Sequence, residues 1–347
     1  MKDTYVSDDT ENEEIDFRYE ITSYGADYPV DSIIKRIKDN VIYVPKFQRK
    51  YVWNIAQASK FIESLILGLP VPGVFLSREN KTGRLLIVDG QQRLMSLYHF
   101  YNGIFKKKEF ILSGLQSNLN GETYKSLDTS DRNRLDDSII HATIVRQDEP
   151  DDEESSIYLI FERLNTGGKP LAAQEIRACI YYGDFNDLLD ELKDNKDWRK
   201  IFGNENERLK EQELLLRFFA LYYNKGNYAK PLKGFLNKFM ASNRNLEKYS
   251  KKALTTLFNE TIKHFADEFS NKAFRMERAF NAAIFDSMMV GLAERMKKGK
   301  PSSAKFKEAY QNLLDDEEYI ANIKAGTSDL KNIEDRIKSA IAAFSKI

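Results

Sequence analysis

The sequence predicts an α+β protein with a sheet-containing N-terminal domain followed by a mainly α-helical domain. Up to residue 147, short β-rich runs alternate with amphipathic helical patterns, and beyond it the patterns are almost all helical. The length of 347 residues suits about two domains, and 42% hydrophobic residues are enough for a core. We therefore expect an acidic disordered tail at 1–27, an α+β domain at 28–147 and a helical domain at 148–347.

Each element of the first domain has a local signal. Asp31 is expected to cap a short helix, and a strand at 41–44 ends at a proline. Asn54 is expected to cap a second helix that Gly68 ends. The next elements are strands at 74–79 and 84–88 joined by a hairpin loop, a helix from residue 90 to Gly103, and a strand at 139–145.

The second domain begins with an acidic run at 148–154, which favours a helix N-terminus and predicts a helix that ends near residue 164. Glycines at 167 and 168 break the pattern, and Pro170 starts the next helix, to residue 181. The remaining predicted helices are 184–193, 211–224, 231–241, 250–270, 273–297, 303–313 and 329–344.

Several classes of protein are disfavoured. With Cys179 as its one cysteine the chain forms no internal disulfide or cysteine zinc cluster, which favours a cytoplasmic protein. No apolar run reaches the ~18 residues of a membrane span, and the N-terminus does not resemble a signal peptide. The three histidines are isolated, and the motifs of zinc hydrolases, serine hydrolases and HNH nucleases are missing.

The charge is balanced over the whole chain but not within it. The sequence has 53 basic and 53 acidic residues, which excludes a uniformly basic nucleic-acid-binding coat. Residues 44–108, however, contain eleven Lys and Arg against three acids. This segment also contains two candidate phosphate-binding motifs.

The first motif is the run from Asp89 to Arg93, Asp-Gly-Gln-Gln-Arg, between a strand and a helix. N–H groups at a helix N-terminus attract anions, Gly90 permits close approach, and Arg93 has a guanidinium suited to phosphate. Gln91 and Gln92 add amides, and Asp89 is a candidate Mg²⁺ or ribose ligand. The residues alone leave an equal alternative, in which Asp89 caps the helix and Arg93 makes a structural ion pair.

The second motif, at 44–53, mixes three cations with three aromatic side chains and contains Gln48 and Arg49. Such a mixture binds phosphates and stacks on bases. The alternative is a surface turn with Phe47 and Trp53 as buried anchors. We expect both to hold in part, with the aromatic rings inward and Arg49 outward.

A third candidate lies where two predicted helices meet, and its glycine pair can point N–H groups into a concavity. Its spacing differs from a Walker loop, and the alternative is a corner with Gly167 as a left-handed cap. Its candidate nucleotide-binding residues are Arg163, Asn165, Thr166, Gly167, Gly168 and Lys169.

These motifs resemble a known family. The matching stretches are VPKFQRKYVW at 44–53, FIESLILGLPVPGVFL at 61–76, IVDGQQRLMSL at 87–97, FERLNTGGKPLAAQEIR at 161–177 and FNAAIFDSMM at 280–289. They resemble the N-terminal domain family of GmrSD-type restriction endonucleases, within the ParB/sulfiredoxin-like superfamily. The resemblance implies a ParB/sulfiredoxin-like N-terminal domain with a small mixed sheet.

The resemblance also implies a nucleoside triphosphate site. Gly90, Gln91, Gln92 and Arg93 would hold phosphates, and Gln48 and Arg49 would approach from the facing segment. Mg²⁺ would bind at Asp89. The candidate catalytic residues are Asp89, Gln91, Gln92 and Arg93.

The resulting hypothesis is an NTP-binding and NTP-hydrolysing subunit of an anti-phage or modification-dependent restriction system. Because the histidine motif of an HNH nuclease is missing, we expect a separate nuclease or other effector, and DNA, as partners. The alternative is a non-catalytic ParB-like module that binds DNA or protein, and a ParB-like nuclease is a weaker one. The oligomeric state, including a homo-oligomer, stays open.

Overall fold

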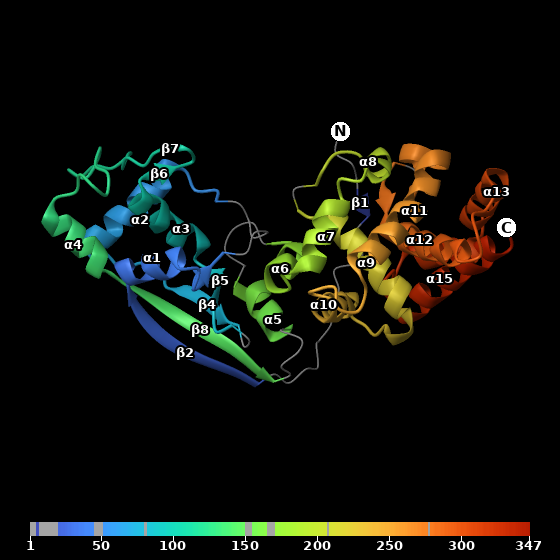
Figure 1. Ribbon diagram of the computed structural model, residues 1–347, viewed down its shortest axis with the longest axis horizontal. Coiled ribbons are helices and arrows are strands. Elements are labelled where there is room, and N and C mark those ends of the chain that lie inside the picture. The colour runs from blue at the N-terminus through green and yellow to red at the C-terminus, as the bar shows by residue number, and fades with distance from the viewer. Residues whose placement is uncertain are drawn as a thin grey trace. The chain divides into compact units, whose positions relative to one another are not determined.

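The computed structural model describes residues 5–6, 20–44, 51–79, 82–149, 155–164, 171–206, 208–276 and 278–347. The chain divides into two compact units (Figure 1). The N-terminal unit comprises residues 18–171 and 178–180. The C-terminal unit comprises residues 172–177 and 181–347 together with the first strand. The sequence-predicted boundary after residue 147 comes before a helix that lies in the N-terminal unit.

A five-stranded mixed sheet forms the base of the N-terminal unit, as the predicted α+β class requires. Its order is β2-β8-β4-β5-β3. β8 is antiparallel to β2 and parallel to β4, whereas β5 is antiparallel to β4 and parallel to β3. The strands are β2 Glu20–Pro29, β3 Ile42–Tyr43, β4 Val74–Arg78, β5 Leu85–Asp89 and β8 Ile139–Glu149, with a separate hairpin of β6 Ile104–Phe105 and β7 Lys108–Glu109.

Four helices gather on one side of this sheet (Figure 1). They are α1 Val30–Lys38, α2 Ile55–Ile66, α3 Gln91–Asn102 and α4 Thr129–Asp137. Their apolar faces form one core with the strands. α2 begins as predicted, because the Asn54 side chain accepts the Gln57 N–H and the Gln57 side chain accepts the Asn54 N–H. A fifth helix, α5 Ser155–Leu164, packs against β8 and β5.

Some predictions for this unit were wrong. Residues 20–27, expected in a disordered tail, form most of β2, which pairs with β8 from Glu20↔Glu149 to Pro29↔Ile139. Pro29 rather than Asp31 stands at the N-cap of α1. The segment before β8, expected to be irregular, contains α4 capped by Asp128. Asp148 and Glu149 lie in β8 rather than at a helix start.

The C-terminal unit is built almost entirely of helices. They are α6 Ala173–Ile180, α7 Asp184–Leu192, α8 Lys196–Phe202, α9 Lys210–Asn224, α10 Leu232–Ser242, α11 Lys251–Phe269, α12 Ala282–Met296, α13 Ser303–Leu314, α14 Glu317–Lys324 and α15 Leu330–Ser345. α12 lies between α11 and α15 (Figure 1), and residues 282–293 are all buried. A two-residue strand, β1 Tyr5–Val6, pairs in parallel with β9 Phe280–Asn281.

The helical prediction for this unit is correct in class and wrong in two details. The helix expected at 273–297 begins only at Ala282, because the Asn281 side chain accepts the N–H groups of Ala283 and Ile284 and caps α12. Residue 274 has a φ of 59°, which no helix continues through. α8 and α14 were not predicted. Among the described residues no helix is long and apolar enough to cross a membrane.

A buried ion cluster joins three helices of this unit. The Asp286 carboxylate of α12 accepts from Arg217 Nη2 of α9 at 2.6 Å and from Arg336 Nε of α15 at 3.2 Å. Arg336 also donates to the Thr327 carbonyl. All three charged side chains are at most 1% exposed. Because the cluster is buried, the Asp286 carboxylate that both guanidinium groups contact is important for compensation of their charge.

Replacing the carboxylate should therefore destabilise the C-terminal unit. We expect Asp286→Asn to lower the free energy of unfolding by about 3–5 kcal/mol, because it removes the negative charge that both buried guanidinium groups contact. Urea unfolding followed by circular dichroism measures this. Asp267→Asn, on the exposed side of α11, is the matched control and should change stability by less than about 0.5 kcal/mol. Equal midpoints for the two variants would contradict this role of Asp286.

Two helical glycines of the same unit should respond in opposite directions. A Cβ at Gly291 of α12 would lie 2.8 Å from the Ala340 backbone of α15, whereas one at Gly234 of α10 would meet only the Pro231 ring at 3.8 Å. We expect Gly291→Ala to destabilise by about 1–3 kcal/mol through overpacking. Gly234→Ala should stabilise by about 0.5–1 kcal/mol through helix propensity. Thermal unfolding of both variants tests the pair, and stabilisation by both would show that α12 and α15 can separate freely.

Candidate functional site

The candidate site is built at the junction where β5 passes into α3. Gly90 stands between Asp89, the last residue of β5, and Gln91, the first of α3, with a φ of 94° that favours glycine. As a glycine, Gly90 provides no side-chain cap to the start of α3. A Cβ at Gly90 would lie 2.4 Å from Val74 Cγ1 of the neighbouring strand. The close packing on β4 therefore requires glycine here, whether or not a ligand approaches.

Arg93, in the first turn of α3, bridges two neighbouring segments. Its Nη2 lies 2.7 Å from Asp89 Oδ2, and its Nη1 donates to the Pro72 carbonyl at 2.8 Å. The Arg93 side chain is 14% exposed, and that of Asp89 is 47% exposed. The Arg93–Asp89 ion pair, one of the two alternatives for this motif, is thus present. The Asp89 carboxylate nevertheless remains partly exposed to solvent.

Gln92 fastens a second segment to the same turn. Its side-chain carbonyl accepts the backbone N–H groups of Val52 at 2.9 Å and Trp53 at 3.1 Å. The end of the second sequence motif is thereby held against α3. The two motifs lie about 40 residues apart in the sequence, and the described part of the second, residues 51–53, contacts the first. One end of the Gln92 side chain is committed to this contact.

Tyr51 extends the contact along α3. Its hydroxyl lies 2.8 Å from Ser96 Oγ, and Ser96 Oγ donates to the Gln92 carbonyl oxygen at 2.7 Å. The Tyr51 ring meets His99 edge-on with a centroid distance of 5.2 Å, and the Lys106 ammonium lies 5.8 Å from its centroid. Burial raises the pKa of Tyr51 and lowers the pKa of His99. Both side chains are therefore neutral near pH 7.

The junction offers one carboxylate to a metal ion. Among the residues that the structure describes, no group of three or more His, Cys, Asp or Glu is placed to hold a metal. Mg²⁺, however, is commonly bound by one or two carboxylates with phosphate oxygens and water completing its shell. The half-exposed carboxylate of Asp89 fits the protein's share of that pattern.

The other predicted site residues are only partly placed. Gln48 and Arg49 lie outside the described residues, as do Asn165, Thr166, Gly167, Gly168 and Lys169. Arg163 is exposed in the last turn of α5, the helix that packs against β5. Trp53, one of the two predicted anchors, is partly buried with its ring edge-on to Phe61. The roles of these residues in nucleotide binding stay predictions.

Two residues at the junction were missed as site residues. Tyr51 and Ser96 link the loop to α3, and Ser96 stands four residues after Gln92 on one face of the helix. That spacing is visible in the sequence and would have indicated the pair. Pro72, which contributes a backbone carbonyl to Arg93, carries no side-chain signal.

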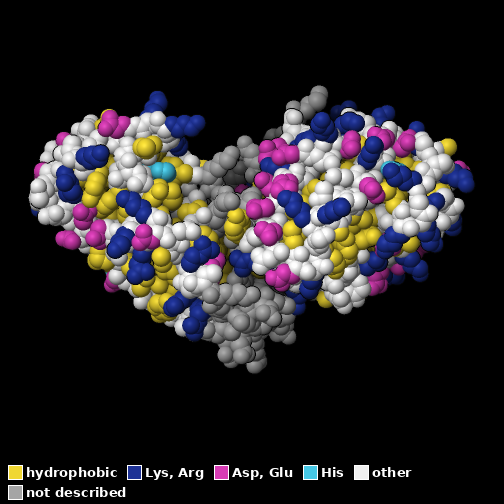
Figure 2. Space-filling model, in the orientation of Figure 1, with side chains coloured by type: hydrophobic (Ala, Val, Ile, Leu, Met, Phe, Trp, Pro, Cys, Tyr) yellow, Lys and Arg dark blue, Asp and Glu magenta, His cyan; other side chains and the backbone are white. Residues whose placement is uncertain are grey.

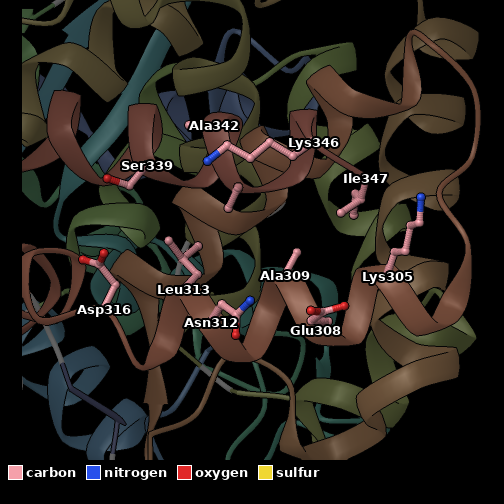
Figure 3. A pocket seen from close by; sticks show the side chains of 11 residues that line it. Lys305, Glu308, Ala309, Asn312, Leu313, Asp316, Ser339, Ala342, Lys346 and Ile347 are labelled. Atoms are coloured by element: carbon pink, nitrogen blue, oxygen red, sulfur yellow. The ribbon is translucent and has the colours of Figure 1, made fainter.

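A cavity of about 540 Å³ lies elsewhere, between α13 and α15 of the C-terminal unit (Figure 3). Its lining combines Ala309, Leu313 and Ala342 with charged side chains such as Lys305 and Glu308. It contains none of the residues predicted to bind nucleotide. We therefore keep the β5–α3 junction as the candidate site.

Comparison with known proteins identifies the family of the N-terminal part of the chain. Residues 30–182 match the family model described as the GmrSD restriction endonuclease, N-terminal domain. The match begins with α1, includes the β5–α3 junction and ends just after α6. No curated protein matches the chain. Residues 30–182 thus form a domain of the GmrSD restriction endonuclease N-terminal domain family.

Proposed function

We propose that the N-terminal unit binds a nucleoside triphosphate at the β5–α3 junction and hydrolyses it. The observation that carries this proposal is the start of α3, where the N-cap is a glycine in the left-handed conformation and Arg93 lies in the first turn. N–H groups in a first helical turn and the helix dipole favour phosphate at such a position. Arg93 adds a guanidinium within the same turn.

The charges at the junction fit a metal–nucleotide complex better than a bare nucleotide. Asp89 is half-exposed and would repel phosphate on its own. Mg²⁺ held by Asp89 would neutralise charge on the phosphate oxygens. Arg93, now paired with Asp89 and the Pro72 carbonyl, would then direct its guanidinium to phosphate. Asp89, Gln91 and Gln92 are the candidates for positioning the attacking water.

The family supports a role in restriction, and the regulatory part of the function is our inference. We infer that nucleotide binding and hydrolysis control contacts with DNA or with a separate nuclease, in defence against phage or modified DNA. The sequence motivates the separate nuclease, because it contains no HNH-type histidine motif. Mg²⁺ and the nucleotide are the cofactors of this proposal.

Replacing Arg93 by lysine tests the site while keeping its charge. We expect Arg93→Lys to weaken binding of the preferred nucleotide by about tenfold or more, because an ammonium lacks the planar fork of donors. The measurement is the rise in melting temperature with ATP, GTP, CTP or UTP and Mg²⁺, followed by phosphate release.

Arg134→Lys, on the exposed surface of α4 in the same unit, is the matched control. It should bind and turn over nucleotide like the wild type. Equal affinity and turnover in the wild type and Arg93→Lys would remove the β5–α3 junction as the site. Failure of all four nucleotides to stabilise the wild type would refute nucleotide binding itself.

A second function is favoured by one feature of the junction. Gly90, Gln92 and Arg93 each already have a packing or hydrogen-bonding partner within the protein. A non-catalytic module that binds DNA or protein would need these residues only to hold its fold. In that case residues 89–93 would stabilise the fold of the N-terminal unit. The basic surface of the unit would then bind the DNA or protein partner.

The structural role of Gln92 can be measured by itself. We expect Gln92→Met to lower the free energy of unfolding by about 1–2 kcal/mol, because the Val52 and Trp53 N–H groups lose their acceptor. Amide exchange at both residues should become faster. Gln116→Met, at an exposed loop position, is the control. If exchange at residues 52 and 53 is unchanged, Gln92 does not hold this segment.

A further inference from the structure

Three tyrosines form a cluster on the C-terminal unit. Tyr222 and Tyr223 end α9, and Tyr249 lies in the loop between α10 and α11. The rings of Tyr223 and Tyr249 are stacked at 3.9 Å, and Tyr222 meets Tyr223 edge-on at 4.8 Å. All three side chains are half-buried.

Basic side chains flank this cluster from two parts of the chain. Residues 225–252 contain eight Lys and Arg against one acid, and residues 295–300 contain four against none. Contacts join both segments to the tyrosines. The Lys297 ammonium lies 5.0 Å from the Tyr222 ring centroid, and Glu294 pairs with both Lys297 at 2.6 Å and Lys225 at 3.6 Å. One carboxylate thus serves two lysines and leaves an excess of positive charge.

The exposed side chains around the cluster are polar. Lys248, Lys252 and Lys298 are exposed, and Lys248 directly precedes Tyr249. In the described part of the chain, the exposed large hydrophobic side chains include none from 222–252 or 294–300. A membrane or an apolar protein partner needs such side chains. A polyanion needs only charge and hydrogen-bond donors, which this surface has.

The ring faces of these tyrosines are occupied within the cluster, and the Tyr222 hydroxyl is hydrogen-bonded to Lys297. Burial raises the pKa of Tyr222 and of Tyr223, so both keep their hydroxyl protons at any physiological pH. Their ring faces are used within the cluster, because Tyr249 stacks on Tyr223 and on Phe239, and Lys297 lies over Tyr222. Bases of a single strand need open ring faces, whereas the phosphates of a duplex need donors and cations.

We propose that this tyrosine–lysine surface, formed by Tyr222, Tyr223, Tyr249, Lys248, Lys252, Lys297 and Lys298, binds the phosphate backbone of double-stranded DNA. The contacts go to phosphate oxygens, so binding is independent of sequence and strongly dependent on salt. The surface lies in the C-terminal unit, and its action does not depend on a nucleotide at α3. The rise in melting temperature of the wild type with nucleotide is measured separately. Whether or not a nucleotide binds, the result leaves this proposal unaffected.

The test removes three cations that have no role in packing. We expect Lys248→Gln, Lys252→Gln and Lys298→Gln together, in the full chain, to make the slope of log affinity against log salt shallower by about 2–3. Fluorescence anisotropy with a short random-sequence duplex between about 50 and 200 mM NaCl measures it. The control triple is Lys263→Gln, Lys324→Gln and Lys338→Gln, exposed lysines of the same unit, which should keep the wild-type slope.

Three probes separate duplex DNA from other polyanions. Affinity should fall in the order duplex, single strand, polyglutamate. Tighter binding of single strand or polyglutamate would overturn the assignment. The assignment would also be overturned if both triple variants lost the same amount of salt slope, or if neither lost any. Absence of duplex binding by the wild type would overturn it as well.

The tyrosine hydroxyls have their own test. Tyr222→Phe with Tyr223→Phe keeps both rings and removes two donors, and should weaken duplex binding by about 3- to 10-fold without changing the salt slope. Unchanged affinity would show that the hydroxyls do not contact the backbone.

Discussion

The N-terminal unit depends on the close contact between Gly90 and Val74, which sets how β5 turns into α3. A Cβ added at Gly90 would lie only 2.4 Å from Val74 Cγ1, so α3 would have to move away from β4. In its present place α3 directs Arg93 to Asp89 and to the Pro72 carbonyl, and Gln92 to the N–H groups of Val52 and Trp53. One backbone conformation thus fixes the end of β5, the loop before β4 and the segment before α2.

The same contacts explain why ligand binding and folding are difficult to separate at this junction. A nucleotide would have to draw the Arg93 guanidinium from partners that the protein already provides. Asp89 is the more accessible member of the pair. A divalent cation held by the Asp89 carboxylate would compete with Arg93 for that carboxylate and so weaken the ion pair. A phosphate ligand would therefore have to replace the present partners of Arg93, because the guanidinium already has hydrogen bonds within the protein.

The sequence predicted best where the signal is local. Asn54 with Gln57, and Gly103 at the end of α3, determine their helix ends through neighbouring backbone groups, and both were found. β2 was missed because its side chains are largely exposed and its partner β8 is more than 100 residues away. The candidate site shows the same limit. Asp89 to Arg93 were evident as a motif, whereas the Pro72 carbonyl and the hydroxyl of Tyr51 enter only through tertiary contacts.

Zero net charge follows from segments of opposite sign rather than from a neutral surface. Lysine, arginine and acidic side chains appear on the visible faces of both units (Figure 2). Residues 44–108 and 225–252 are each strongly basic, with eleven and eight cations against three and one acids. The first segment contains the β5–α3 junction, where Arg93 is paired with Asp89. In the second, several lysines are exposed. Because screening weakens exposed charges more than paired ones, salt should reduce DNA binding by the second segment more than it disturbs the junction.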